Sequence, residues 1–329
     1  MTKVLVTGAN GFLGAVVVKE LSQAGYEVRA LVRSLSNTVK FPADVEVVTG
    51  DIRDAVVTKQ VAAGCEGIIH LAGKVHAIDE REGNEGDYYQ TNVEGTRHVL
   101  EGAATAHVQR VIFASSVKVF GKSTEGCVDE TASPTPQTAY ARSKWQAEKL
   151  VSEYGKRTGT VAVSLRLPMV YGPTEKGNLY RMISAIDHGR FPPFPKIDNQ
   201  RSLVHVRNVA QAMLCCLRQT RTRLSAYIVA DAQPYSTTHL YESLCRGLGK
   251  RLPSWRVPLG LLKAAARFGD LVQIGTGRTF ALTTSTLGKL IESAWYSPAA
   301  IARDCGYSPF YSFDDAVPEI VNFYRMSTT

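Results

Sequence analysis

The stretch Lys3-Val-Leu-Val-Thr7-Gly8-Ala-Asn10-Gly11-Phe12-Leu13-Gly14 decides the fold of this chain. A short run of strand-forming residues leads directly into glycines three residues apart, and a helical pattern follows from Phe12 to Ala24. Such glycines let the backbone turn tightly against a pyrophosphate, and the positive end of the helix favours that anion. The turn therefore predicts a dinucleotide site that includes Gly8, Asn10, Gly11, Phe12, Leu13 and Gly14.

Strands and helices alternate in the residues that follow. Apolar, β-branched runs predict strands at 27–32, 45–48, 67–71 and 111–113, and a helix lies between the second and third of these, around 58–63. This alternation is typical of an α/β fold with a doubly wound parallel sheet of the Rossmann type, in which ligands bind at the carboxyl ends of the strands.

Arg33 follows the second predicted strand, where a site for NAD normally has an acidic side chain that binds the ribose 2′-hydroxyl. A guanidinium there can pair with a 2′-phosphate, so the sequence favours NADP as the cofactor. NAD remains an alternative if Arg33 faces solvent.

Two further features predict proton-transfer chemistry. The strand at 111–113 ends in Ser115-Ser116, and a predicted helix after Thr138 carries Tyr140 and Lys144, four residues apart and on one face. An ammonium near a phenol stabilises the phenolate and brings its pKa towards neutrality. Ser116, Tyr140 and Lys144 are therefore the predicted catalytic residues for hydride transfer at a carbinol or carbonyl carbon.

Eight motifs in collinear order, over about two thirds of the chain, resemble the extended short-chain dehydrogenase/reductases of the NAD-dependent epimerase/dehydratase family. Besides the glycine turn and the Tyr140/Lys144 pair, they are Gly50-Asp-Ile-Arg-Asp54, His70-Leu-Ala-Gly73, Asn92-Val-Glu-Gly-Thr96, Ser115-Ser-Val-Lys-Val-Phe-Gly121, Leu167-Pro-Met-Val-Tyr-Gly-Pro173 and Arg201-Ser-Leu-Val-His-Val206.

The resemblance implies roles for further residues. It places Asp51 and Ile52 at the adenine, and Pro168 and Val170 at the nicotinamide, and it assigns Arg201 to a substrate diphosphate. Leu71, Ala72 and Gly73, in the motif that begins at His70, are also expected at the cofactor site. His76, Lys118 and Asn178 are candidate substrate residues, with an ordinary surface or core position as the alternative for each.

One departure from the family pattern narrows the set of reactions that we expect. Val117-Lys118 stands where sugar 4,6-dehydratases have an Asp-Glu pair, so dehydration is disfavoured. The motifs are most similar to a bacterial subgroup of UDP-sugar 4-epimerase-like proteins that includes UDP-N-acetyl-6-deoxyhexose 4-ketoreductases. The resemblance thus implies reduction of a UDP-4-keto-6-deoxy-N-acetylhexosamine. The alternatives are a UDP-sugar 4-epimerase with tightly bound NAD, a reductase of the dihydroflavonol or 3β-hydroxysteroid type, and a non-enzymatic dinucleotide-binding regulator.

Charge and composition limit the partners. All of the net charge of +8 lies beyond residue 170, since residues 1–170 have 19 basic and 19 acidic side chains and residues 171–329 have 19 and 11. Scattered basic residues favour an acidic small molecule, such as a UDP-sugar, over nucleic acid. No apolar run is long enough to span a membrane, and the N-terminus lacks the pattern of a secretory signal, so we expect a cytoplasmic protein. The six cysteines lack metal-ligand spacing, and we expect no metal and no disulfide.

The second half of the chain predicts a smaller, interleaved α+β substrate-binding region. We expect the dinucleotide-binding domain to comprise residues 1–170 and about 204–229, and the substrate region about 171–203 and 230–329. In this division the chain leaves the sheet after Tyr171 and returns to it at 204–206. The amphipathic stretch 255–274 is expected to pack over the active-site cleft, with membrane docking as the alternative. A homodimer is the expected assembly.

Overall fold

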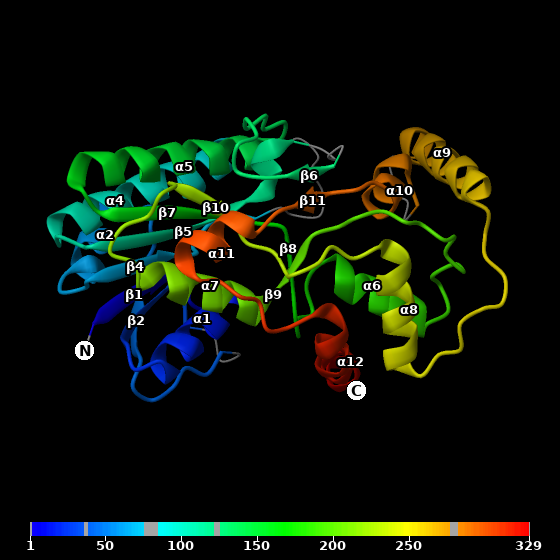
Figure 1. Cartoon of the computed structure of the whole chain (residues 1–329), viewed down its shortest axis with the longest axis horizontal. Helices are drawn as coiled ribbons and strands as arrows, with labels where there is room; N and C mark the ends of the chain where they lie inside the picture. Colours follow the sequence, from blue (N-terminus) through cyan, green and yellow to red (C-terminus); the bar gives the residue numbers. More distant parts are fainter. Residues whose placement is uncertain (1, 36–38, 76–84, 122–125, 277–281, 329) are drawn as a thin grey trace.

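A parallel sheet of seven strands forms the centre of the protein. The computed structural model describes residues 2–35, 39–75, 85–121, 126–276 and 282–328. The strand order is β10-β7-β5-β4-β1-β2-β3 (Figure 1). The strands are β1 (Lys3–Thr7), β2 (Glu27–Val32), β3 (Glu46–Thr49), β4 (Gly67–His70), β5 (Arg110–Ser116), β7 (Val161–Leu167) and β10 (Ala226–Ile228). The predicted α/β fold with a doubly wound sheet is confirmed.

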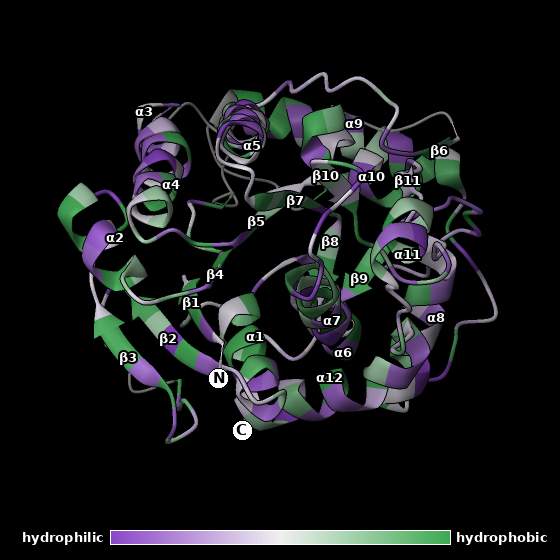
Figure 2. Cartoon of the chain, turned by 60° about the vertical axis from the view of Figure 1, so that its left-hand side comes forward, coloured by the Kyte–Doolittle hydropathy of each residue, from purple (hydrophilic) through white to green (hydrophobic). Residues whose placement is uncertain are grey.

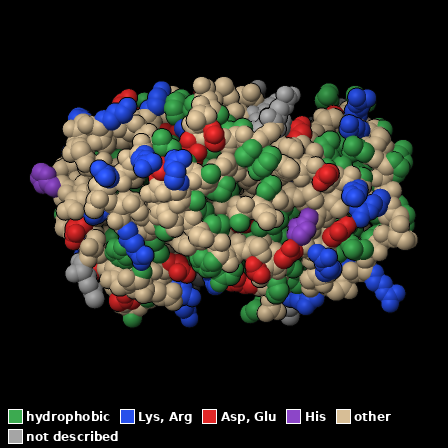
Figure 3. Space-filling model, in the orientation of Figure 1, with side chains coloured by type: hydrophobic (Ala, Val, Ile, Leu, Met, Phe, Trp, Pro, Cys, Tyr) green, Lys and Arg blue, Asp and Glu red, His purple; other side chains and the backbone are tan. Residues whose placement is uncertain are grey.

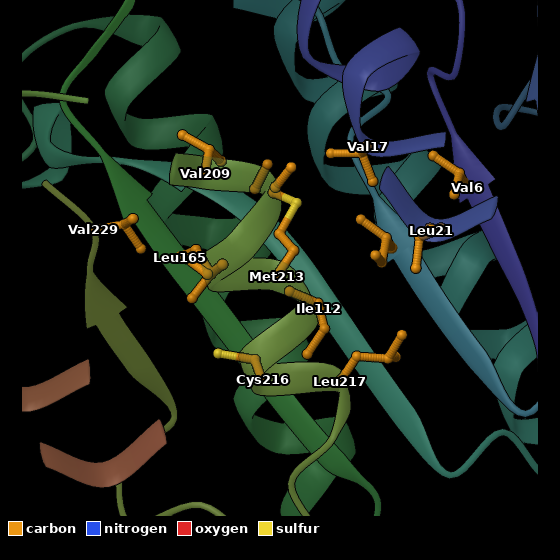
Figure 4. Packing of buried hydrophobic residues seen from close by; sticks show 14 of the residues in the cluster. Val6, Val17, Leu21, Ile112, Leu165, Val209, Met213, Cys216, Leu217 and Val229 are labelled. Carbon is orange, nitrogen blue, oxygen red and sulfur yellow. The ribbon is translucent and has the colours of Figure 1, made fainter. Parts of the chain in front are cut away.

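Helices cover both faces of this sheet (Figure 2). One face packs against α1 (Phe12–Gln23), α7 (Val206–Leu217) and α11 (Ala299–Cys305), and the other against α2 (Ala55–Ala62), α4 (Gly95–Thr105) and α5 (Ala139–Thr158). Because side chains alternate along a strand, Val4 and Val6 join the first core and Leu5 joins the second. Figure 4 shows the first core, where Val17 and Leu21 of α1 and Met213 of α7 point towards the strands.

A second apolar core lies beyond the carboxyl ends of the strands. It is built from α6 (Asn178–Asp187), α8 (Thr237–Leu248), α9 (Leu259–Thr276), α10 (Thr284–Ile291) and α12 (Phe313–Thr328). The division of the chain into residues 1–170 with 204–229, and 171–203 with 230–329, stays a proposal. Ala300, Ile301 and Cys305 of α11 pack in the sheet core although this division assigns them to the substrate region.

Two pairs of short strands connect the cores. β8 (Met169–Tyr171) pairs with β9 (Leu203–His205), and β6 (Cys127–Val128) pairs with β11 (Trp295–Tyr296). The expectation that the chain rejoins the main sheet at 204–206 is therefore wrong, because β9 pairs with β8 instead. An apolar run of three residues does not contain the information that selects its partner strand.

The predicted helix at 255–274 forms as α9, but much of its apolar surface faces solvent. Leu262 and Ala266 are buried in the second core, whereas Leu261, Phe268 and Leu271 are 63–67% exposed. The expectation that this stretch packs over a cleft therefore does not hold for its large exposed side chains. The described helices include none with the length and apolarity needed to cross a membrane.

Replacing Gly14 with Ala should lower the free energy of unfolding by about 2 kcal/mol, as overpacking of a buried site does. A Cβ there would lie 2.2 Å from the Gly8 carbonyl oxygen and 2.8 Å from the Ala9 backbone, and neither can move without shifting the turn. Urea unfolding of the cofactor-free protein measures the loss. Gly260→Ala is the control, because a Cβ at this helical position meets no atom within 4 Å. Equal unfolding midpoints for Gly14→Ala and the unmodified protein would contradict the prediction.

Candidate active site

The glycine turn between β1 and α1 leaves space for a ligand against its backbone. Gly8 has a φ of +68°, and a Cβ on it would lie 2.7 Å from the Ala72 backbone nitrogen. The Gly11 N–H donates to the Gly8 carbonyl at 3.0 Å, which closes the turn. α1 begins without a side-chain cap and without an acidic residue in its first turn, so no carboxylate competes for its N-terminal N–H groups. The turn therefore fits the pyrophosphate of a dinucleotide.

The residues predicted to bind the adenosine lie at the ends of β2 and β3. Arg33 is exposed, and its charge helps to hold the pKa of Asp51 below its usual value, although the larger cause is the Arg53 guanidinium, 2.7 Å from the Asp51 carboxylate. Asn10 donates to the Ser34 carbonyl at 3.3 Å and so ties the glycine turn to this edge. Ile52 is buried against Gly95, where a Cβ would come within 2.6 Å of it.

The structure brings together the three residues predicted to be catalytic. Ser116 ends β5 and caps a short 3₁₀-helix, Val117–Phe120, and its hydroxyl lies near enough to the Tyr140 phenol to lower the pKa of that phenol. Thr138 caps α5, so that Tyr140 lies in the first turn and Lys144 one turn later. All three side chains are at least 92% buried.

Burial controls the pKa values of this group. Desolvation raises the pKa of Tyr140 to about 12, against the hydrogen bond with Ser116, which lowers it. Desolvation also lowers the pKa of Lys144 to about 8, while the Glu148 carboxylate opposes this change. Burial is the largest influence on the Tyr140 pKa, and the expectation that the Lys144 ammonium brings this pKa towards neutrality stays a prediction. At neutral pH Tyr140 is a protonated phenol and hence a proton donor.

Lys144 is held on three sides. Its ammonium donates to the Ala114 carbonyl at 2.9 Å and lies 4.6 Å above the Phe113 ring. A Cβ at Gly73 would come within 3.2 Å of Lys144 Nζ, so this glycine allows the β4 loop to approach the ammonium. Gly73 follows Leu71 and Ala72, and all three lie where the cofactor is predicted to bind.

A buried ion pair that the sequence reasoning missed lies one turn further along α5. The Glu148 carboxylate accepts a hydrogen bond from the Ser115 hydroxyl at 2.5 Å and binds the Arg166 guanidinium at 2.8 Å. The guanidinium also lies 4.8 Å from the Phe120 ring. Glu148 lies four residues after Lys144 on α5. This spacing was the available signal for Glu148 in the sequence, but it does not identify Arg166 as its partner. The pair ties β5, β7 and α5 together directly behind the catalytic residues.

A chain of hydrogen bonds through His70 fixes the loop after β4. Thr96 donates its hydroxyl hydrogen to the Asn92 carbonyl at 2.6 Å, so it accepts from His70 Nε2 at 3.0 Å. His70 Nδ1 is then the acceptor for Thr7, 2.7 Å away, and Thr7 accepts the Ala72 N–H at 3.1 Å. Burial lowers the pKa of His70 to about 3, so the ring stays neutral and both bonds persist at neutral pH.

Asn92 is a second residue that the sequence analysis quoted without giving it a role. It lies in a π-helical segment, Tyr89–Glu94, and is 1% exposed. Its amide donates to the Ser143 hydroxyl at 2.9 Å and accepts the Lys74 N–H at 2.7 Å. Asn92 therefore connects the loop after β4 to the helix that carries Tyr140 and Lys144.

The predicted substrate residues are spread over several elements. Asn178 begins α6, is exposed, and lines a shallow hollow together with Val170, while Pro168 is buried beside β8. Lys118 is exposed on the 3₁₀-helix. Arg201 donates to the Glu292 carbonyl at 3.1 Å, and burial lowers its pKa. His76 lies outside the described residues. Ser116 and Tyr140 do not line the hollow, so the structure does not join these residues into one pocket.

Comparisons with known proteins agree with this geometry. Residues 4–230 match the model of the NAD dependent epimerase/dehydratase family. The chain is 30% identical to a UDP-glucose 4-epimerase of Vibrio cholerae over 78% of both chains. It is 26% identical to the N-acetyl-alpha-D-glucosaminyl-diphospho-ditrans,octacis-undecaprenol 4-epimerase of Escherichia coli O157:H7, over 93% of this chain and 91% of that protein. A Thermus thermophilus UDP-glucose 4-epimerase, solved in complex with NAD, has a similar fold, with a TM-score of 0.73 at 23% identity over 98% of this chain and 99% of that one.

Glu148→Gln should lower the free energy of unfolding by about 3–5 kcal/mol, because it leaves the buried Arg166 guanidinium without a counter-charge. Chemical denaturation measures the effect. Glu153→Gln, on an exposed position of the same helix, is the matched control and should change stability by less than about 0.5 kcal/mol. A similar small change for both variants would show that the ion pair does not support the site.

Proposed function

Because the chain belongs to the NAD-dependent epimerase/dehydratase family, we propose that it is a reductase that acts on the 4-keto group of a UDP-4-keto-6-deoxy-N-acetylhexosamine. Family membership makes the chain an enzyme of the short-chain dehydrogenase/reductase type. The observation that carries the proposal is the buried Tyr140 phenol, whose pKa is raised by burial and which lies beside Ser116 at the sheet edge where the glycine turn lies.

The proposed roles of the site residues follow from their positions. A bound nicotinamide dinucleotide supplies hydride to the carbonyl carbon. Ser116 holds the carbonyl oxygen through its hydroxyl, and Tyr140 donates the proton that this oxygen needs as it becomes a hydroxyl. Lys144, fixed by the Ala114 carbonyl, holds positive charge beside the phenol and stabilises the phenolate that remains after the transfer.

Substrate selection is proposed to depend on the second half of the chain. The excess of basic over acidic residues there suits the diphosphate of a nucleotide sugar. The Arg201 guanidinium donates to the Glu292 carbonyl, and because a guanidinium has five N–H donors it can also bind phosphate oxygens. The absence of an Asp-Glu pair at Val117-Lys118 disfavours dehydration.

A UDP-sugar 4-epimerase is the second candidate, and it is favoured by the similarity to the Vibrio and Escherichia 4-epimerases. An epimerase must oxidise and reduce the same carbon with one cofactor molecule, whereas a reductase releases the oxidised cofactor after each turnover. The two reactions therefore differ in whether nucleotide stays bound during purification. A reductase for an apolar ketone is the third candidate and predicts no response to UDP.

The purified enzyme should oxidise NADPH when a UDP-4-keto-6-deoxy-N-acetylhexosamine is added, and Tyr140→Phe should slow this reaction at least about a hundredfold because it removes only the proton donor. Cofactor affinity should stay within a few-fold, since the ring is retained. Absorbance at 340 nm follows the reaction, and a fluorescence titration measures binding. Tightly bound NAD, interconversion of UDP-glucose and UDP-galactose and no net NADPH oxidation would instead identify the epimerase. A Tyr140→Phe rate within tenfold of the unmodified enzyme would refute the role of Tyr140.

We also propose that Arg33 makes the enzyme prefer NADP(H). A charge-assisted hydrogen bond to the 2′-phosphate contributes about 1.5–3 kcal/mol, or about ten- to a hundredfold in affinity. Arg33→Asp should remove this preference and favour NAD(H), as isothermal titration with both cofactors would measure. Arg157→Asp, exposed on α5, is the control for the change in net charge. Equal affinities for both cofactors in the unmodified enzyme, and no change in Arg33→Asp, would show that Arg33 does not select the cofactor.

A further inference from the structure

An apolar surface with basic neighbours remains outside the proposed active site. Leu252 is 43% exposed and Trp255 is 61% exposed in the segment before α9, and Leu261, Phe268 and Leu271 of α9 are 63%, 64% and 67% exposed. We call Leu261, Phe268 and Leu271 the docking face. Leu261, Phe268 and Leu271 follow one another at spacings of seven and three residues, which places them on one side of the helix.

The packing of α9 accounts for this exposure. Leu262 and Ala266 pack in the second core, where α9 contacts α10. The buried side of α9 thus contributes one leucine and one small side chain to this core. The larger apolar side chains lie on the part of the helix that is turned outwards. A helix that served only to complete the core would bury its large apolar side chains and turn its polar side chains towards solvent.

Basic residues predominate around the docking face, where the acidic Asp270, between Phe268 and Leu271, accepts the Thr284 N–H. From Arg246 to Arg267 the sequence contains six basic residues and no acidic residue. Lys250 pairs with Asp187, and Arg256 pairs with Glu242. Lys263 and Arg267 are exposed on α9 itself, and neither has a carboxylate partner among the described residues. Figure 3 shows green apolar and blue basic side chains together at the end of the molecule where Figure 1 places α9.

We propose that the docking face binds the surface of an anionic lipid bilayer. Leu261, Phe268 and Leu271 would enter the headgroup region, and Lys263 and Arg267 would bind lipid phosphates. Apolar side chains beside exposed cations, on a helix that cannot span the bilayer, are the features of an interfacial helix. The inference goes beyond the proposed function and does not depend on it.

The charge pattern also disfavours a second copy of this chain as the partner that binds the docking face. A twofold interface places the same patch on both subunits, so the unpaired cations of one copy would face those of the other. An anionic surface supplies the missing negative charge instead.

The docking face lies at the substrate side of the molecule. α9 packs on α10, and the chain after α10 contains Glu292, whose carbonyl accepts from Arg201. It also contains Ala294, whose carbonyl accepts the backbone N–H of Ser202. Figure 1 shows α9 at the end of the molecule opposite α2. A bound membrane would therefore lie on the side of the proposed diphosphate contact and leave the glycine turn free.

The test is cosedimentation of the full chain with extruded vesicles of phosphatidylcholine alone and of phosphatidylcholine with phosphatidylglycerol. We expect binding to the mixed vesicles, at least about tenfold weaker binding to phosphatidylcholine, and weakening as salt rises. Lys263→Gln/Arg267→Gln should weaken binding to mixed vesicles by about 20-fold, since each cation near an anionic surface contributes about fivefold. Lys156→Gln/Arg157→Gln on α5 is the matched control and should bind like the unmodified chain.

A second pair of variants tests the apolar contribution. Phe268→Ser/Leu271→Ser should weaken vesicle binding at least about tenfold, whereas Val56→Ser/Met326→Ser, at exposed apolar positions of α2 and α12, should not. Circular dichroism and sedimentation velocity show whether each variant is folded and whether its mass changes. The expected result is an unchanged spectrum and an unchanged mass.

Three results would overturn the proposal. The first is no binding of the folded chain to the mixed vesicles. The second is binding of Phe268→Ser/Leu271→Ser to these vesicles as strong as that of the unmodified chain. The third is a dimer of the unmodified chain in solution that is absent in this variant. Vesicle binding needs no cofactor and no turnover, so its failure is distinct from failure of the proposed reductase activity.

Discussion

Burial of the Lys144 ammonium is the constraint on which the arrangement of the site depends. A cation removed from water needs hydrogen bonds and opposite charge nearby, and here the Ala114 carbonyl, the Phe113 ring and the Glu148 carboxylate meet that need. These groups come from β5 and α5. A shift of the helix along the sheet would therefore leave the buried ammonium without its partners. The same fixed packing places Tyr140 against Ser116.

The buried polar network extends this constraint to the cofactor side. Asn92 and His70 link α4 and its π-helical start to the loops that follow β1 and β4, through bonds whose donors and acceptors are all assigned. Gly73 lets the loop approach Lys144, and Gly8 lets the turn approach Ala72. The glycine turn and the proposed proton-transfer group therefore lie at one edge of the sheet, where the proposed function places the dinucleotide and the substrate.

Many features of the fold and site were predictable because they are local. The strand-glycine-helix pattern predicted β1 and α1 to within a residue, and a Thr before an amphipathic run predicted the start of α5. β9 was misplaced, since its three residues fit either sheet equally well by pattern. The Glu148–Arg166 ion pair was missed because its members lie 18 residues apart on different elements, and no local pattern relates them.

The sequence by itself determined the α/β class, the glycine turn and the pairing of Tyr140 with Lys144 on one helical face, because each depends on spacings of two to four residues. The tertiary structure alone decided the protonation states and the exposure of α9. Desolvation of Tyr140 and Lys144 depends on everything packed around them, and it is the largest cause of the pKa shift of each residue. Likewise, an amphipathic pattern shows that a helix has an apolar side, but only the packing of α9 on α10 decided which apolar residues remain in contact with solvent.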